Sequence, residues 1–326
     1  MTQAPQAETA TSGETADLAE RLLAGDRLAL TRAITRVENR RPGAGELLRG
    51  LTPHTGHAYL LGVTGPPGGG KSTLVTQIVK QLRERGDKVA VIAIDPTSAI
   101  SGGALLGDRI RMLEFHTDPH VFIRSMASRG ILGGLSATTG DVARLLDAFG
   151  FDWIIIETVG VGQGEVAVAG LADTTLLIEV PGLGDDVQAI KAGVLEVADI
   201  LVVNKADKEG AARLSSALRG MLSLAHAEGW RPPIVQTVAA DGKGVSELLG
   251  EIAKHRAYLE TTGGRGERTH ARLRAEVLDR AGALLGARLV ALMDSDPAFL
   301  AAQRQLDRRE IDPATVAADL AARFAG

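Results

Sequence analysis

A glycine-rich segment that ends in lysine, serine and threonine carries the clearest chemistry in the sequence. Residues 65–73 read GPPGGGKST, which matches the pattern G-x-x-x-x-G-K-[S/T] between an apolar run and a helical pattern. In such a phosphate-binding loop (P-loop) the backbone amides turn toward phosphate oxygens, the lysine reaches the outer phosphates and the serine ligates magnesium. The segment therefore predicts a nucleoside triphosphate site. The residues expected to line it are Gly65, Pro66, Pro67, Gly68, Gly69, Gly70, Lys71, Ser72 and Thr73.

A second motif indicates which base the nucleotide carries. The segment VVNKAD places Asn204, Lys205 and Asp207 after an apolar run, at the point where ligands dock on a parallel sheet. The Asp207 carboxylate can accept two hydrogen bonds from the N1 and N2 edge of guanine, whereas adenine offers no such pair of donors. In the later segment TVAADGKGV, the backbone amide of Ala239 can meet guanine O6. The motifs in this order predict GTP.

Three carboxylates are expected around the metal ion and the attacking water. Asp95 ends the apolar run after the P-loop helix, with a turn cap before proline as its alternative role. Glu157 ends the run DWIIIE, where a buried carboxylate without a partner would be costly. Asp108 lies on the loop beyond Asp95, and the residues alone leave a helix cap and a site role equally open. With Ser72 these carboxylates form the predicted metal site, and with Lys71 the predicted catalytic set.

Short apolar runs that alternate with amphipathic stretches must position these residues. The runs lie between Tyr59 and about Val238 and read YLLGV, VAVIAI, VFIRS, WIIIE, TLLIEV, DILVVN and PIVQTV. Apolar, β-branched runs separated by helices are typical of parallel strands buried on both faces. We therefore predict an α/β fold of the P-loop NTPase type, with a doubly wound, mainly parallel sheet and helical extensions at both ends.

The chain divides into four predicted parts. Residues 1–16 are polar and indicate a disordered tail, and residues 17–51 an N-terminal helical arm. Residues 52–260 form the predicted GTP-binding domain. Residues 261–326, which begin with the flexible segment TTGGRGER, form a C-terminal helical arm.

Helix caps and an apolar stripe organise the two arms. Asp26 is expected to cap a helix of the N-terminal arm, and Asp296 and Asp312, each followed by proline, two helices of the C-terminal arm. The C-terminal arm also carries an apolar stripe made up of Leu273, Val277, Leu284, Leu285, Leu289 and Leu292. Since a lone surface helix needs fewer apolar residues, we expect the stripe to pack on the core or on a second subunit.

Composition narrows the classes of function. The chain has 326 residues, 45% of them hydrophobic, so it can bury a sizeable core. A formal net charge of -4 and the lack of a long basic run argue against nucleic acid as a partner. Cysteine is absent, which excludes disulfides and thiolate metal sites. With no apolar run long enough for a membrane span and no secretion signal, we expect a soluble, cytoplasmic protein.

Several segments together closely resemble the MeaB/ArgK family, the G proteins that are chaperones of adenosylcobalamin-dependent methylmalonyl-CoA mutase. These segments are GPPGGGKST, DPTSAISGGALLGDRIRM, RSMASRGILGGLS, ETVGVGQGE, PGLGDDVQAIKAG and VVNKAD. The resemblance implies a GTPase that binds GTP, GDP and Mg²⁺, has a low intrinsic rate raised by the mutase, and forms a homodimer through its C-terminal arm. The functional positions that it implies are Lys71, Asp95, Asp108, Glu157, Gln188 and Lys191. Glutamate is normal for this branch where Ras-like GTPases have the aspartate of Asp-x-x-Gly.

Gln188 and Lys191 also have a case of their own as partner-coupling residues. They lie three residues apart on a predicted helix after PGLGDD, so they share one face. Such polar faces are usually only solvated, and it is the resemblance that favours a switch. The chain departs from the family pattern at Val238, where serine is common, and at Gly69, where alanine is usual.

Two other kinds of protein share parts of this pattern. Nickel-delivery GTPases carry cysteine and histidine ligands, but this chain lacks cysteine and its 7 histidines are scattered. The second kind is a transport-linked P-loop ATPase or kinase, or a partitioning ATPase. The partitioning ATPases use a lysine early in the loop, where this chain has Pro66 and Pro67, and they lack Asn-Lys-x-Asp. The cobalamin motif Asp-x-His-x-x-Gly is also absent, because DPHVFI places Ile123 at the glycine position. Cobalamin is therefore expected on the partner, a mutase of methylmalonyl-CoA or a related acyl-CoA.

Overall fold

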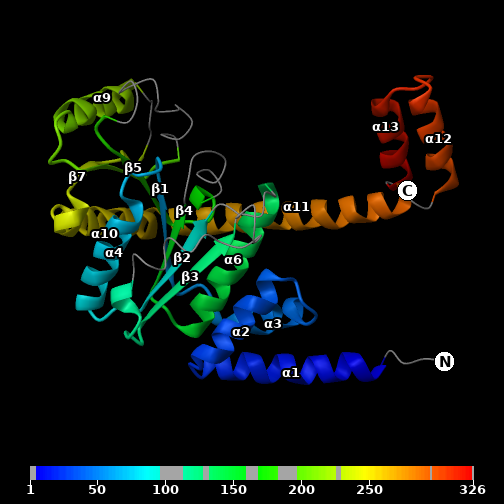
Figure 1. Ribbon diagram of the computed structural model, residues 1–326, viewed down its shortest axis with the longest axis horizontal. Helices are drawn as coiled ribbons and strands as arrows, with labels where there is room; N and C mark the ends of the chain where they lie inside the picture. Colours follow the sequence, from blue (N-terminus) through cyan, green and yellow to red (C-terminus); the bar gives the residue numbers. More distant parts are fainter. Residues whose placement is uncertain are drawn as a thin grey trace. The chain divides into compact units, whose positions relative to one another are not determined.

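The structure is a computed structural model of the chain (Figure 1). It describes residues 5–95, 113–127, 132–158, 168–182, 197–224, 229–293 and 296–324. Asp108, Gln188 and Lys191 lie outside the described residues. The chain forms two compact units, Met1–Arg272 and Leu273–Gly326.

A parallel sheet forms the centre of the first unit. Its strands are β1 (Tyr59–Thr64), β2 (Val89–Asp95), β3 (Val121–Ala127), β4 (Trp153–Thr158), β5 (Thr174–Glu179), β6 (Ile200–Asn204) and β7 (Ile234–Thr237). The 7-stranded sheet has the order β3-β2-β4-β1-β5-β6-β7, and every neighbouring pair is parallel. These are the strands that the apolar runs predict, and the α/β fold is confirmed.

Helices cover both faces of the sheet. The helices and 3-10 turns that accompany the strands are α4 (Lys71–Glu84), α6 (Leu132–Phe149), α9 (Ala211–Leu224), α10 (Val245–Thr262), η1 (Thr52–His54), η2 (Leu113–Phe115) and η3 (Ala239–Asp241). Figure 1 shows α4 and α10 on one side of the sheet and α6 on the other. Successive residues of β4 enter different cores, since Ile155 packs with α4 whereas Ile154 and Ile156 pack with α6.

The N-terminal arm is built from α1 (Pro5–Leu23), α2 (Arg27–Glu38) and α3 (Ala44–Leu51). It packs against α6, so it belongs to the same core as β2 and β4. The predicted cap of α2 is confirmed, because the Asp26 carboxylate accepts hydrogen bonds from the first backbone amides of the helix.

The N-terminal arm begins earlier than the sequence predicts. We expected a disordered tail over residues 1–16, but α1 is helical from Pro5 onward. Contacts with α2 explain part of the difference, since Arg36 forms an ion pair of 2.8 Å with Glu14 and the Thr15 side chain lies only 4% exposed. Local composition does not show such contacts between helices.

The C-terminal arm consists of α11 (Gly264–Met293), α12 (Pro297–Asp307) and α13 (Pro313–Phe324). The expected flexible break shrinks to a turn at Gly263, whose φ of 76° is in the left-handed region. The predicted caps are confirmed: Asp296 accepts a hydrogen bond from Ala298 N at 2.8 Å and Asp312 from Ala314 N at 2.9 Å. No helix in the described ranges is both long and apolar enough to cross a lipid bilayer.

The apolar stripe of α11 is exposed. The exposed fraction is 64% for Val277 and 73% for Leu284, and other members of the stripe are also open to solvent. The prediction that the stripe packs on the core is thus not met within the described chain, and packing on a second subunit stays a prediction.

Two buried aspartates hold the start of α11 at the edge of the sheet where the strands begin. Asp199 precedes β6, and its carboxylate forms a two-pronged contact with Arg268, with distances of 2.9 and 2.6 Å. Asp173 precedes β5 and lies 3.5 Å from Arg265 and 3.9 Å from Arg272. Since these arginines follow one another at helical spacing, one face of the helix is fixed to this edge.

The second half of α10 contributes His255 to the same network. His255 is fully buried, its Nδ1 lies 2.7 Å from Thr174 Oγ1 and its Nε2 lies 3.3 Å from Asp199. Thr174 is in turn 2.5 Å from the hydroxyl of Tyr59, and burial raises the pKa of Tyr59 to about 12. Burial also lowers the pKa of His255, so the imidazole is neutral near pH 7.

Candidate nucleotide-binding site

The P-loop connects β1 to α4 in a conformation that only glycine adopts readily. Gly65, Gly68 and Gly70 have φ values of 138°, 72° and 86°. A Cβ on Gly65 would collide with the carbonyl of Ile178 in β5, and one on Gly70 with the side chain of Asn204. The loop can therefore lie close to two neighbouring strands, and α4 begins directly after Gly70, so that the helix N-terminus lies at the loop.

Lys71 is buried inside the loop that it follows. Its side chain is 6% exposed, and its Nζ donates hydrogen bonds to the carbonyls of Gly65 at 2.8 Å and Pro66 at 2.9 Å. Thr73, two residues further along α4, is exposed. Backbone oxygens thus hold the ammonium group at the loop, so it is already positioned to bind a phosphate.

A buried serine and glutamate meet below the loop. Ser72 opens α4 and Glu157 lies near the end of β4, and their Oγ and Oε1 atoms are 2.7 Å apart. Neither side chain is more than 4% exposed. Hydroxyl and carboxylate oxygens are the ligands that Mg²⁺ prefers, so the pair fits a magnesium ion.

Asp95 ends at the same edge of the sheet as Glu157. In the register of β2 and β4, Ala93 lies opposite Glu157, so Asp95 is two residues further along its strand. The backbone of Asp95 also pairs with Ala127 of β3. The sheet therefore brings Asp95 to the P-loop edge, while Asp108 lies outside the described residues.

Asn204 joins the guanine motif to the P-loop. Its Nδ2 donates to the carbonyl of Gly69 at 2.8 Å, and its Oδ1 accepts from Thr237 Oγ1 at 3.0 Å and from the Ala239 amide at 3.1 Å. Lys205 Nζ donates to the carbonyl of Gly68 at 2.7 Å. The side chains of Asn204 and Lys205 thus fix the distance between the guanine motif and the P-loop.

Asp207 and Ala239 differ in how open they are to a base. Asp207 is exposed beyond the end of β6, as a carboxylate that reads guanine needs to be. The Ala239 amide, expected to meet guanine O6, donates to Asn204 and is 3% exposed as a residue. Thr237, whose hydroxyl donates to Asn204, is not part of either motif, although a hydroxyl at the carboxyl end of a strand in this fold is a signal for a place in the binding site.

Comparisons with known proteins agree with this geometry. The chain is 49% identical over 305 residues to a protein of Pyrococcus abyssi that is named as a GTPase, covering 92% of this chain and 94% of that protein. It is 37% identical over 261 residues to the mouse methylmalonic aciduria type A homolog, mitochondrial, covering 74% and 63%. A crystal structure described as a LAO/AO transport system kinase superposes with a TM-score of 0.71 at 28% identity, covering 96% of this chain and 98% of that one.

A family model completes the assignment. It is the model for the methylmalonyl-CoA mutase-associated GTPase MeaB, and it matches residues 30–294, which include the P-loop, both acidic strand ends and the guanine motif. The chain therefore belongs to the MeaB family of GTPases, a P-loop family that binds guanine nucleotides.

Proposed function

We propose that this protein is a GTP-dependent chaperone that couples its nucleotide state to the loading, protection or reactivation of an adenosylcobalamin-dependent acyl-CoA mutase. Methylmalonyl-CoA mutase is the first candidate for the partner. The observation that carries the proposal is a guanine-type P-loop site in a chain of a family named for association with that mutase. The mouse relative, whose name refers to methylmalonic aciduria, supports the same substrate class.

The proposed catalytic centre needs a magnesium ion. Ser72 and Glu157 supply hard oxygen ligands that lie together at the foot of the P-loop, and Asp95 and Asp108 are proposed as further carboxylates of the site. When bound, the ion offsets the charge that develops on the β- and γ-phosphates. Lys71 places a fixed positive charge on the phosphate side, and the buried surroundings strengthen its interaction with the transferred group.

The partner reads the nucleotide state through a switch in this proposal. A chaperone can gate cofactor transfer only if its GTP and GDP states bind the mutase with different affinity. We assign that coupling to Gln188 and Lys191, which follow the glycine-containing segment after β5. Association of two chains through the exposed stripe of α11 completes the proposed assembly, because this stripe offers an apolar surface for a second copy.

The test compares GTP hydrolysis and adenosylcobalamin transfer with and without the mutase from the same organism. We expect the mutase to raise the hydrolysis rate and the nucleotide to control transfer. In Lys191→Ala, basal hydrolysis and GTP affinity should stay near the parent values, while the stimulation is lost. Lys80→Ala removes an exposed lysine of α4 and is the matched control, with full stimulation expected.

Two results would contradict the proposal. A mutase that changes neither the hydrolysis rate nor the nucleotide dependence of transfer would remove the chaperone function. Equal loss of basal and stimulated hydrolysis in Lys191→Ala would make Lys191 part of the catalytic centre and not of a switch.

A further inference from the structure

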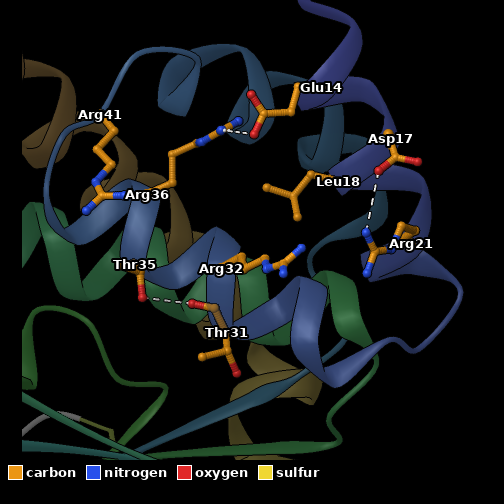
Figure 2. Close-up of a pocket in the computed structure, with 9 residues that line it drawn as sticks. All are labelled: Glu14, Asp17, Leu18, Arg21, Thr31, Arg32, Thr35, Arg36 and Arg41. Atoms are coloured by element: carbon orange, nitrogen blue, oxygen red, sulfur yellow. Dashed lines mark hydrogen bonds and ion pairs between the residues drawn. The ribbon is translucent and has the colours of Figure 1, made fainter. Parts of the chain in front are cut away.

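A hollow between α1 and α2 lies in the N-terminal arm, on residues that the nucleotide site does not use. Its volume is about 350 Å³, within the range of small-ligand pockets. Figure 2 shows side chains from both helices around it. The residues that line it are Glu14, Asp17, Leu18, Arg21, Thr31, Arg32, Thr35, Arg36 and Arg41.

The lining of the hollow carries an excess of positive charge. Among the described residues of the lining, the arginines are Arg21, Arg32, Arg36 and Arg41, and the carboxylates are Glu14 and Asp17. Both carboxylates are engaged, because Glu14 pairs with Arg36 at 2.8 Å and Asp17 with Arg21 at 3.6 Å. Arg21 has a second partner outside the lining, Asp26, at 2.6 Å.

Arg32 and Arg41 supply the uncompensated charge. Within the described ranges, neither guanidinium forms a hydrogen bond or an ion pair with another residue. Figure 2 shows Arg32 reaching from α2 toward α1, with its guanidinium near Leu18 and Arg21. Two cationic side chains on the rim of one hollow raise its positive potential, which favours an anion.

Hydrogen-bonding capacity also selects an anion. The hydroxyls of Thr31 and Thr35 already donate to the carbonyls of Arg27 and Thr31 within α2, each at 2.9 Å. The donors left for a ligand are therefore guanidinium N–H groups, which have no acceptor capacity. Forked guanidinium donors match the two oxygens of a carboxylate or phosphate. Leu18, 6% exposed, forms an apolar floor below them.

We propose that this hollow binds a small oxyanion of at least two negative charges, with phosphate or carboxylate groups, as a second anion site separate from the P-loop. Arg32 and Arg41 provide the primary contacts. Arg21 and Arg36 contribute only the guanidinium N–H groups that their partners leave unused, which are Asp17 and Asp26 for Arg21 and Glu14 and Thr15 for Arg36. A small ligand is favoured over a macromolecule because the charged groups surround a hollow of limited volume instead of forming a flat surface.

The test titrates inorganic pyrophosphate into the GDP-saturated protein, so that the P-loop is filled, in magnesium-free buffer with calorimetric detection. We expect saturable binding of one pyrophosphate per chain. The double variant Arg32→Gln/Arg41→Gln should weaken this binding by at least about tenfold, because it removes two charge-assisted contacts. Arg49→Gln changes an exposed arginine of α3 that does not line the hollow, and it should bind as the parent does.

Further arms separate the hollow from other anion sites. Lys71→Ala should keep the second binding event, because the P-loop lysine does not contribute to it. GDP affinity, circular dichroism and melting temperature should be unchanged in the double variant, whose replaced side chains are exposed. Citrate in place of pyrophosphate distinguishes a carboxylate from a phosphate source, and binding of either supports the proposal.

Other outcomes overturn it. These are unsaturable binding, equal loss in Arg49→Gln, or equal displacement by chloride and sulfate at one ionic strength, which would mean an adventitious ion only. Loss of the event in Lys71→Ala would return it to the P-loop. A glutamate-rich peptide that binds more tightly than pyrophosphate and citrate would make the hollow a protein-docking surface and would reject the small-ligand proposal.

Discussion

Glu157 is a fully buried carboxylate, and such burial is informative at the scale of single residues. The carboxylate has Ser72 as a hydrogen-bond partner, and magnesium would supply the positive charge that burial demands. Glu157→Gln keeps the shape of the side chain and removes the charge. We expect GTP turnover to fall by roughly a hundredfold or more, as for other electrostatic stabilisers.

Single-turnover hydrolysis at saturating Mg²⁺ measures this effect. Asp152→Asn is the matched control, since Asp152 comes just before the same strand, at the end opposite Glu157. Among the described contacts its carboxylate accepts a hydrogen bond only from the backbone amide of Lys88, at 2.7 Å. Parent-rate hydrolysis in Glu157→Gln would exclude Glu157 from the metal site.

The base specificity depends on the exposed carboxylate of Asp207. Asp207→Asn replaces an acceptor with an amide that donates to the additional oxygen of xanthine. We expect GTP affinity to drop by at least roughly a hundredfold and xanthosine triphosphate to bind more tightly, because two hydrogen bonds to a charged group are lost. Nucleotide titration measures both affinities. Asp241→Asn is the control, because this carboxylate lies in the segment TVAADGKGV, is 54% exposed and is not expected to contact the base, so both affinities should stay unchanged. Unchanged affinities in Asp207→Asn would mean that Asp207 does not read the base.

Sequence motifs predict which residues form the site better than they predict its contacts. The order of P-loop, acidic strand end and Asn-Lys-x-Asp placed Lys71, Glu157 and Asn204 in one region. The bridge from Asn204 to the carbonyl of Gly69 joins residues that are 135 positions apart, and it depends on how two loops approach each other. No local pattern encodes such an approach, and for the same reason the bond between Asn204 and the Ala239 amide was not foreseen.

At the scale of elements, the strands were predictable because each is a buried apolar run, whereas the beginning of α1 was not. Residues before Asp17 are polar and resemble a disordered tail in composition. Their helical state is supported by the contact between Arg36 and Glu14, which comes from the neighbouring helix. The same limit applies to the anchoring of α11, because Asp173 and Asp199 look like ordinary strand-flanking aspartates in the sequence.

His255, in the second half of α10, should make the stability of the protein sensitive to acid. Burial holds the pKa of His255 below its usual value of 6.5, against the opposite influence of Asp199, while Arg268 acts in the same direction as burial. As the pH falls below about 6.5, the unfolded chain binds a proton that the folded chain resists, so the free energy of unfolding decreases. Above that pH both states are neutral and the contribution is constant.

Urea unfolding between pH 7.5 and 5 measures this dependence. We expect His255→Gln, which retains a polar partner for Thr174, to flatten the acid side of the curve. His116→Gln, an exposed histidine, should leave the curve as in the parent. An unchanged slope in His255→Gln would mean that other groups cause the acid sensitivity.

The whole molecule is expected to be a dimer that depends on the stripe of α11. Leu284→Asp places a charge in the middle of the stripe, at a side chain 73% exposed in the single chain. Folding should be unaffected. The dissociation constant of the dimer should rise by at least roughly tenfold, because a charge buried in the interface would need a partner there.

Light scattering coupled to size-exclusion chromatography measures the mass at several concentrations. Arg274→Gln, an exposed polar position of the same helix, is the control and should remain a dimer. A parent protein that is monomeric at all concentrations would reject the second-subunit role of the stripe.

The position of α10 fixes which parts of the chain can vary in length. The helix begins just after Gly244, beside the guanine loop, and reaches the buried network at His255. One residue inserted in α10 before His255 would rotate the following part of the helix by about 100° and shift it by about 1.5 Å along the helix axis. His255 would then leave Thr174, and the α11 arginines would leave their aspartates. Insertions and fusion points between Gly244 and Arg272 should therefore disrupt the buried network. The chain beyond Arg272 can be lengthened without a change at the segment TVAADGKGV.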